Sequence, residues 1–354
     1  MNHPPGILLY CRPGFEGECA QEITALAAEA GAAGYVRAKP ASGLVFFAPY
    51  ELSAGQLRRR LAFRDLVFAR QMIHEAVLLD ALPTGDRIDP LLAAVRSQFG
   101  GGFGTLHLET ADTSEAKELG GFLRRFGPAL DSALRKAGLL RNDPAAARLH
   151  ICFLGSAAAY LGVTDVANSS PWPMGIPRLR MPRQAPSRST LKLAEAFAVM
   201  LTPEERADWL REGRTACDLG AAPGGWTWQL LHHGLHVTAI DNGALAPALL
   251  ADDRVDHLRA DGLHWRPRRP VDWVVCDMVE KPSRIAELMT EWLADGHAAR
   301  AIFNLKLPMK KRREALETCT LILRRRLAAV DFRLDMRQLY HDREEVTAYL
   351  RPVA

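Results

Sequence analysis

The chain has 354 residues, of which 48% are hydrophobic, and its formal net charge is only +4 at pH 7. No apolar run reaches the roughly 18–20 residues of a membrane span, and the amino terminus lacks the basic and apolar segments of a signal peptide. The six cysteines are scattered without a Cys-x-x-Cys pair, which argues against disulfides and zinc. We expect a cytoplasmic protein of two or three domains that holds no metal ion.

Residues 1–165 alternate between strand and helix patterns. Strands are predicted at 7–10, 43–48, 105–112 and 149–154, and helices at 16–33 and 118–137. This pattern favours α+β modules with small sheets. The histidines and cysteines of this half are more typical of core or surface positions than of ligands, and no catalytic constellation is visible.

Residues 166–186 are rich in proline and are predicted to form an extended, semi-rigid linker. Residues 168–194 contain no acidic side chain, but they include Arg178, Arg180, Arg183, Arg188 and Lys192. Further basic clusters lie at 266–269, 310–313 and 324–326. One such cluster is usually a solvated face, but several beside a ligand site point to a phosphate backbone.

Residues 187–354 alternate strands and helices in the doubly wound manner. The predicted strands are 216–219, 237–240, 273–276, 301–305, 332–338 and 346–350. The last two are close enough in the chain to pair antiparallel. We therefore expect an α/β domain with a mostly parallel, Rossmann-like sheet and an antiparallel last strand.

A glycine-rich turn follows the first of these strands. Gly220 permits a tight turn, and small residues at the next positions let a ligand approach the backbone. Asp241 ends the next apolar run, where a carboxylate can accept hydrogen bonds from ribose hydroxyls. The loop lacks both Gly-x-Gly-x-x-Gly and the Gly-Lys-Ser/Thr of a phosphate-binding loop, so S-adenosylmethionine is the expected ligand. The predicted cofactor residues of the turn are Gly220, Ala222, Pro223, Gly224 and Gly225.

Polar residues also stand at the ends of later strands, where ligands of open α/β sheets bind. Asp277 and Lys306 are two of them, and Asp261 is a candidate for the adenine edge, although it is also an ordinary turn former. Burial and a neighbouring cation are expected to lower the pKa of Lys306, so that it can accept a proton from a ribose hydroxyl. Lys192 would supply the cation, Asp277 would orient Lys306, and Glu345 would orient Lys192 or the hydroxyl.

The order Lys192, Asp277, Lys306, Glu345 around Asp-Leu-Gly-x-x-Pro-Gly-Gly-Trp resembles the signature of the FtsJ-type RNA ribose 2′-O-methyltransferases. The resemblance covers nearly the whole chain and is closest to the members that methylate a cytidine of bacterial 23S rRNA. The stretches that carry it are Pro186–Leu193, Cys276–Pro282, Asn304–Arg312 and Gln338–Thr347. One departure is Ala222, where the family often has cysteine.

The resemblance implies that Lys306 accepts the proton, and that Ser189, residues 222–225, Asp241, Asp261 and Asp277 surround the methyl donor. It also implies a ferredoxin-like segment and a THUMP RNA-binding module within residues 1–165, a linker at 166–186 and the methyltransferase domain at 187–354. The basic residues expected to contact 23S rRNA are Arg178, Arg180, Arg183, Lys310, Lys311 and Arg312. The oligomeric state stays open.

Several alternatives remain. A base amino-group methyltransferase usually carries Asn/Asp-Pro-Pro-aromatic where this chain has Asp277-Met-Val-Glu-Lys-Pro. A carbon-5 cytosine enzyme needs a nucleophilic cysteine, whereas Cys276 is expected to face the core. A small-molecule O-methyltransferase needs no large amino-terminal module. The remaining alternatives are a non-catalytic RNA-binding protein and an enzyme that acts on another RNA.

Overall fold

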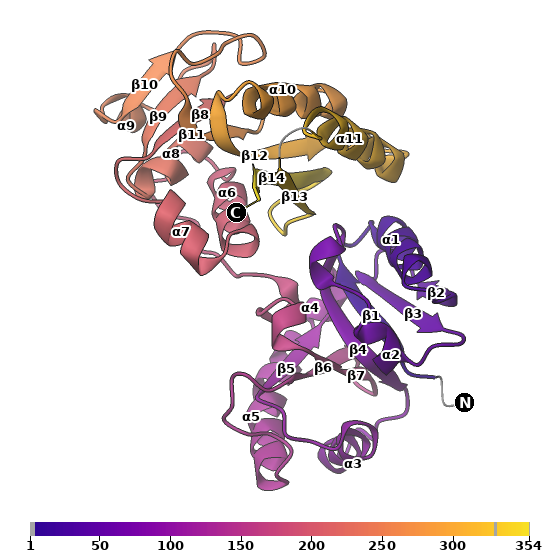
Figure 1. The fold of residues 1–354 in the computed structure, drawn as a ribbon. Helices are drawn as coiled ribbons and strands as arrows, with labels where there is room; N and C mark the ends of the chain where they lie inside the picture. Colours follow the sequence, from indigo (N-terminus) through magenta and orange to yellow (C-terminus); the bar gives the residue numbers. More distant parts are fainter. Residues whose placement is uncertain (1–3, 329–330, 354) are drawn as a thin grey trace. The chain divides into compact units, whose positions relative to one another are not determined.

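The computed structural model describes residues 4–328 and 331–353. The chain forms two compact units, Met1–Ile176 and Pro177–Ala354, and each is built on a seven-stranded sheet (Figure 1). Within the described residues, no helix has the length and hydropathy needed to cross a membrane.

The first unit has its strands in the spatial order β2-β3-β1-β4-β7-β6-β5. The strands are β1 (Gly6–Cys11), β2 (Gly34–Ala38), β3 (Leu44–Pro49), β4 (Ala69–Leu79), β5 (Thr105–Thr110), β6 (Arg148–Gly155) and β7 (Ala158–Thr164). The helices are α1 (Glu16–Glu29), α2 (Ala54–Arg58), α3 (Ile88–Phe99), α4 (Ser114–Lys117) and α5 (Gly120–Lys136), with short 3-10 turns at Phe63–Asp65, Val166–Asn168 and Pro173–Gly175.

One long strand belongs to both modules of the first unit. The eleven residues of β4 pair antiparallel with β1 and also with β7. The register shifts between His74 and Val77, and Glu75 between them has a φ of 53°. Such a bulge bends and twists a strand, which lets β4 continue from one module into the next.

The two faces of this sheet are covered differently. On one face, residues of α3 and α5 pack with Leu149, Ile151 and Leu161 of β6 and β7. The other face carries a separate cluster of strand residues, including Leu8, Phe46 and Cys152, joined by Met174 from the segment after β7; among the described residues it draws none from α1, α3 or α5. Among the described residues, this second face therefore has no cover from α1, α3 or α5.

Residues 166–176 are packed on the first unit, and the linker between the units is correspondingly shorter than 166–186. Asn168 Oδ1 accepts the Phe63 N–H at 2.7 Å, and its Nδ2 donates to the Leu61 carbonyl at 2.8 Å. The Gln71 side chain bonds both the N–H and the carbonyl of Ser170. Proline limits the backbone conformations of this segment, and these hydrogen bonds attach it to the first unit.

The second unit has the strand order β10-β9-β8-β11-β12-β14-β13. Its strands are β8 (Thr215–Leu219), β9 (His236–Ile240), β10 (Val255–Leu258), β11 (Val271–Cys276), β12 (Ala298–Lys306), β13 (Phe332–Arg337) and β14 (Glu345–Pro352). All neighbouring pairs are parallel except those of β14, which is antiparallel to both β12 and β13. The predicted Rossmann-like sheet with an antiparallel last strand is confirmed.

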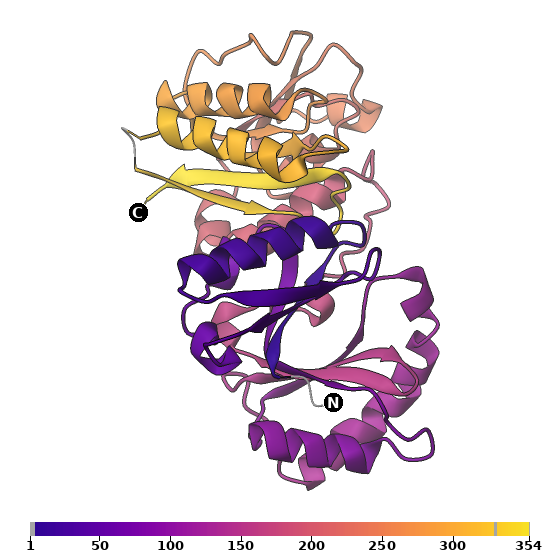
Figure 2. The ribbon, with the colours of Figure 1, turned by 90° about the vertical axis from the view of Figure 1, so that its right-hand side faces the viewer.

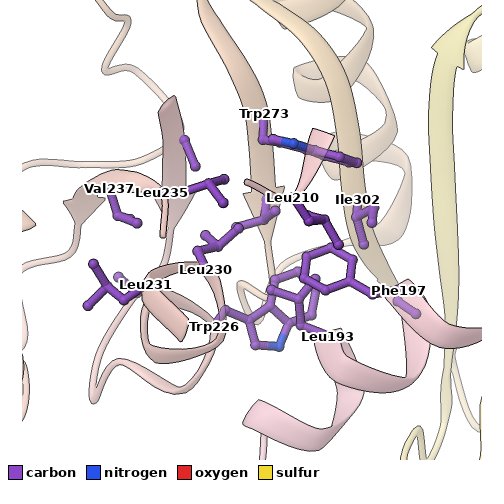
Figure 3. Close-up of a cluster of buried hydrophobic side chains, with 14 of the residues drawn as sticks. Leu193, Phe197, Leu210, Trp226, Leu230, Leu231, Leu235, Val237, Trp273 and Ile302 are labelled. Atoms are coloured by element: carbon purple, nitrogen blue, oxygen red, sulfur yellow. The ribbon is translucent and has the colours of Figure 1, made fainter. Parts of the chain in front are cut away.

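The helices of this unit are α6 (Thr190–Met200), α7 (Pro203–Trp209), α8 (Gly225–His232), α9 (Pro247–Leu250), α10 (Pro282–Ala294) and α11 (Arg312–Arg326). Helices α10 and α11 lie side by side on one face of the sheet (Figure 2). On the other face, Leu193 and Phe197 of α6 meet Trp226 of α8, Trp273 of β11 and Ile302 of β12 (Figure 3). This core fixes α6 against the carboxyl ends of the parallel strands.

Candidate active site

Four charged side chains form a closed ring at the carboxyl edge of the second sheet. Lys192 Nζ donates to Glu345 Oε1 at 2.6 Å and to Asp277 Oδ2 at 3.2 Å. Lys306 Nζ donates to Asp277 Oδ1 and to Glu345 Oε2, both at 2.9 Å. Each ammonium thus bridges both carboxylates, and the structure brings together all four residues that the sequence singled out as catalytic.

Sheet register explains how three of them meet. Lys306 is the last residue of β12 and lies directly opposite Glu345, the first residue of β14. Asp277 follows β11, whose last residue Cys276 is paired with Phe303 of β12. Opposed residues on neighbouring strands have their side chains on the same face, a few ångströms apart. Lys192 reaches the same point from α6, which packs over that face.

The pKa of Lys306 differs from expectation. Burial lowers it, but the carboxylates of Asp277 and Glu345 outweigh burial, and the net result is a pKa above the ordinary value. For Asp277, burial raises the pKa, but the charges of Lys192 and Lys306 act more strongly and hold it below the usual range. The expectation that Lys306 is kept neutral is therefore wrong for this state, because each lysine has two carboxylates as nearest neighbours.

Two uncharged residues extend the ring, and sequence reasoning missed them. Asn304 Nδ2 donates to Asp277 Oδ1 at 3.0 Å, and Asn304 Oδ1 accepts from Thr347 Oγ1 at 2.8 Å. Both are fully buried and lie opposite each other in the β12–β14 register. The available signal was the strand period of two, which puts Asn304 on the same face as Lys306 and Thr347 on the same face as Glu345.

Two adjoining cavities lie beside the ring. One, of about 290 Å³, is lined by Ser187, Ser189, Asp218, Gly220, Ala221, Ala222, Pro223, Trp226 and Asp277. The other, of about 390 Å³, is lined by the turn residues Gly220 and Ala222, the strand-end residues Ile240 to Asn242, residues 260–263 and residues 277–280. Gly220, Ala222 and Asp277 border both, so the two cavities adjoin along the turn.

Two of the expected cofactor residues, Gly224 and Gly225, do not line either cavity. A Cβ on Gly224 would come within 2.1 Å of the Leu249 side chain. A Cβ on Gly225 would come within 2.4 Å of the hydroxyls of Ser187 and Ser189. These glycines therefore serve close packing at the start of α8, and Gly225 makes room for two serines that do face a cavity.

The carboxylates of the cavities have different environments. Asp241 Oδ2 accepts the Ala222 N–H at 2.9 Å and Oδ1 accepts the Gly243 N–H at 2.7 Å, which joins two loops. Asp261 is exposed and accepts from Leu263 N. Asp218 is 1% exposed, and burial raises its pKa to about 7 despite the hydrogen bond from Thr227.

The basic residues expected to meet RNA are not equivalent. Arg178, Arg180, Arg183 and Lys310 are exposed, and the Arg178 guanidinium lies 5.4 Å from the centre of the Tyr340 ring. Lys311 pairs with Glu314 but remains largely exposed. Arg312 is only 17% exposed and its Nη2 lies 2.6 Å from Glu344, so it is the least available of the six for a phosphate.

A buried polar cluster in the first unit was also missed. Glu109 accepts hydrogen bonds from the Tyr10 hydroxyl at 2.8 Å and from the Met174 N–H, and its Oε2 lies 2.9 Å from His150 Nδ1. His107 stands 3.8 Å from the same carboxylate. Burial raises the pKa of Glu109, but His150 and the N–H donors more than reverse this. The network links β1, β5, β6 and the segment after β7.

Comparison with known proteins gives one family throughout. The chain matches the RlmM ferredoxin-like domain over residues 5–73, the amino-terminal region of ribosomal RNA large subunit methyltransferase M over 86–165, and the FtsJ-like methyltransferase domain over 185–321. It is 53% identical to ribosomal RNA large subunit methyltransferase M of Thauera aminoaromatica, covering 98% of this chain and 95% of the relative. The corresponding protein of Methylococcus capsulatus is 54% identical over the full length of both.

Among solved structures, TrmN from Thermus thermophilus is 16% identical and covers 98% of this chain and 99% of its own, with a TM-score of 0.35. A likeness at that level carries no argument about function.

Proposed function

The chain belongs to the ribosomal RNA large subunit methyltransferase M family and is an rRNA methyltransferase, and on this premise we propose that it methylates the ribose 2′-hydroxyl of a cytidine in 23S rRNA with S-adenosylmethionine as donor. The observation that carries the proposal is the ring of Lys192, Asp277, Lys306 and Glu345 beside the two cavities. A ribose hydroxyl needs proton removal to act as a nucleophile, and the ring holds the groups for it.

Lys306 is the proposed proton acceptor. Because the pKa of Lys306 is raised in the closed ring, Lys306 must lose its own proton before it can accept another. Any positive charge added to the site lowers the pKa of Lys306 and so favours that loss. Asp277 and Asn304 fix the position of its ammonium, and Lys192 shares the two carboxylates so that neither is left unpaired. The hydroxyl proton would then pass to Lys306 Nζ as the ribose oxygen bonds the methyl carbon and the sulfur–methyl bond of the donor breaks, with S-adenosylhomocysteine as the leaving group.

The cavities fit S-adenosylmethionine by the chemistry of their walls. Asp241 retains lone pairs toward the larger cavity that can accept from ribose hydroxyls. Asp218, with its raised pKa, is a buried carboxyl that gains a partner when an ammonium group lies in the smaller cavity. Ser189 adds a hydroxyl there, and Asp261 stands at the rim where the adenine edge would lie. The donor supplies an electrophilic methyl group on a sulfonium cation.

The proposed RNA substrate rests on the family of the chain and on its exposed basic side chains. Exposed Arg178, Arg180, Arg183, Lys310 and Lys311 are proposed to contact rRNA phosphates, with Arg312 secondary because of its ion pair with Glu344. The 1–165 region is proposed to act as the targeting module, and the protein to work in the cytoplasm. A ribose hydroxyl looks alike on every nucleotide, so target choice has to come from RNA shape and contacts away from the ring.

The test is to incubate protein, S-adenosylmethionine and a 23S rRNA transcript, and to map ribose methylation by resistance to alkaline cleavage. Protection at a single cytidine is expected. Methylation of a base would leave the RNA fully cleavable and would contradict the proposal. Modification of tRNA in place of 23S rRNA would keep the chemistry but replace the substrate, and donor binding without any transfer would indicate a non-catalytic protein.

A further inference from the structure

One cavity of the first unit lies on the sheet face that α1, α3 and α5 leave uncovered. Its volume is about 1000 Å³, and residues of β1, β2, β3, β6 and β7 line it together with residues that follow β5. It is larger than either cavity beside the charged ring. The proposed function assigns it no role.

The sheet side of this cavity combines aromatic rings with positive charge. The rings of Phe46 and Tyr160 stack with centroids 5.6 Å apart and an angle of 21°. The Arg37 guanidinium lies 4.8 Å from the centre of the Phe46 ring. Among the described residues, Arg37 Nε and Nη2 have no hydrogen-bond acceptor, and Lys39 beside it on the same wall is exposed. The arginine is thus held by stacking and its charge is not neutralised by an ion pair in the described part of the chain.

The lining also includes residues of α4 and its neighbours. These lining residues include Thr113 and the exposed Glu115 and Glu118. These carboxylates would repel a phosphate, but they can accept hydrogen bonds from the exocyclic amino group of a base such as cytosine. The lining of the cavity therefore combines cations, carboxylate acceptors and aromatic rings.

We propose that this cavity binds a single-stranded segment of the RNA substrate. A base packs against the face of Tyr160 with its amino edge toward Glu115 and Glu118, while the backbone phosphates follow Arg37 and Lys39. The inference rests on the proposed function, which supplies rRNA as the substrate, and deepens it by naming a contact that selects unpaired RNA. Stacking platforms beside basic side chains suit single strands, whereas the bases of a duplex are not available for stacking.

The decisive comparison is Tyr160→Leu against Tyr160→Phe in the full-length protein. Leucine fills similar space without an aromatic face, and phenylalanine keeps the face. We expect Tyr160→Leu to raise the KM for protein-free 23S rRNA transcript by about 5- to 100-fold, as the loss of one stacked base predicts, with kcat and the melting temperature near those of the parent. Tyr160→Phe should stay within about twofold of the parent, since it keeps the stacked face. Equal KM values for the two variants and the parent overturn the proposal.

The charged wall is tested by salt dependence. Lys39→Gln is expected to reduce the slope of log affinity against log salt by about 0.7, the value for one phosphate contact on a single strand. Lys136→Gln is the matched control, because Lys136 is also exposed on the first unit but lies at the end of α5, outside the cavity lining. A slope unchanged by Lys39→Gln argues against the phosphate path.

RNA affinity measured by fluorescence anisotropy separates this proposal from the proposed function. If the parent protein methylates no ribose, the proposed function fails, yet a weaker affinity of Tyr160→Leu for a single-stranded oligonucleotide still supports the cavity. If the parent methylates normally and Tyr160→Leu binds and turns over the transcript like the parent, only the cavity proposal fails. An effect that appears with ribosomal particles but not with protein-free RNA identifies a protein occupant and also overturns it.

Discussion

Protonation of Lys306 decides whether the charged ring can act on a hydroxyl. Lys306→Ala is expected to lower kcat by about 10²- to 10⁴-fold, the usual loss on removing a general base, with little change in the dissociation constant for S-adenosylmethionine. The control Lys306→Arg keeps a positive charge between Asp277 and Glu345 but cannot lose a proton at working pH. Both variants should be inactive in a methyl-transfer assay. A nearly active Lys306→Arg enzyme would assign Lys306 an electrostatic role only.

The raised pKa of Lys306 also predicts a pH profile. A base is active only in its deprotonated form, so kcat should rise with pH, tenfold per unit, while the pH is below the pKa of Lys306 in the loaded enzyme. Single-turnover rates measured between pH 6 and 10 test this. A rate that falls across the range would contradict proton transfer to Lys306.

Asp241 is proposed to serve donor binding and not proton transfer. Asp241→Ala removes a carboxylate that also bonds the N–H groups of Ala222 and Gly243. Loss of a charged acceptor costs about 1.5–3 kcal/mol, or roughly 10- to 150-fold in affinity. Calorimetric titration with S-adenosylmethionine should show that loss, and kcat at saturating donor should stay near the parent value. An unchanged affinity refutes the placement.

Asp218 predicts a pH dependence of donor binding. Burial raises its pKa to about 7 in the free protein, so below that pH the carboxyl is largely protonated. An ammonium group favours the ionised form, and affinity for S-adenosylmethionine should therefore rise as pH increases from 6 to 8 and level off above. In Asp218→Asn the same titration should be weaker and nearly flat over this range. Equal slopes of affinity against pH in the two proteins would contradict a role for Asp218 in donor binding.

At the scale of elements, α6 is held in place by a contact between residues that are far apart in the sequence. Glu195 is 2% exposed and accepts the N–H groups of Tyr340 and His341, both at 2.8 Å. Lys192 lies one turn earlier on the same helix. Glu195→Ala removes the acceptor of two part-buried N–H groups, which should lower the free energy of unfolding by about 2–4 kcal/mol, and should reduce kcat because Lys192 is less firmly placed.

Urea denaturation and single-turnover rates on the same preparations measure both effects. Glu204→Ala on α7 is the control, because Glu204 is exposed and surface changes usually stay within about 0.5 kcal/mol. If Glu195→Ala unfolds like the parent, the loop at 338–344 does not depend on this carboxylate.

At the scale of the whole molecule, each unit has its own sheet and buried core. A fragment of residues 177–354 should therefore fold and bind S-adenosylmethionine, because the two cavities and the ring lie within it. It should lose most RNA affinity and nearly all methylation at the single target site. Site-specific methylation by the fragment with undiminished efficiency would show that residues 1–176 are not the targeting device.

The sequence alone determined the features that depend on neighbours along the chain. Apolar runs marked six of the seven strands of the second unit closely enough to place Asp241, Asp277 and Lys306 at strand ends, and the glycine turn predicted a ligand site at that edge. The class of fold followed, because alternating strands and helices have few ways to pack. Strand β10 was not predicted, because its four residues are only partly buried and form no apolar run. The sequence analysis of the first unit likewise did not predict β2, β4, β7 and α3.

Only the tertiary structure decided the features that depend on residues far apart in the chain. The bulge that carries β4 across both modules of the first unit, and the open sheet face with Phe46 and Tyr160, follow from strand pairing that no local pattern encodes. The charge state of Lys306 is the clearest case, because its pKa is set by Asp277 and Glu345, which are 29 and 39 residues away in sequence but 2.9 Å away in space. Coulomb interactions depend on distance and burial, and those are properties of the fold.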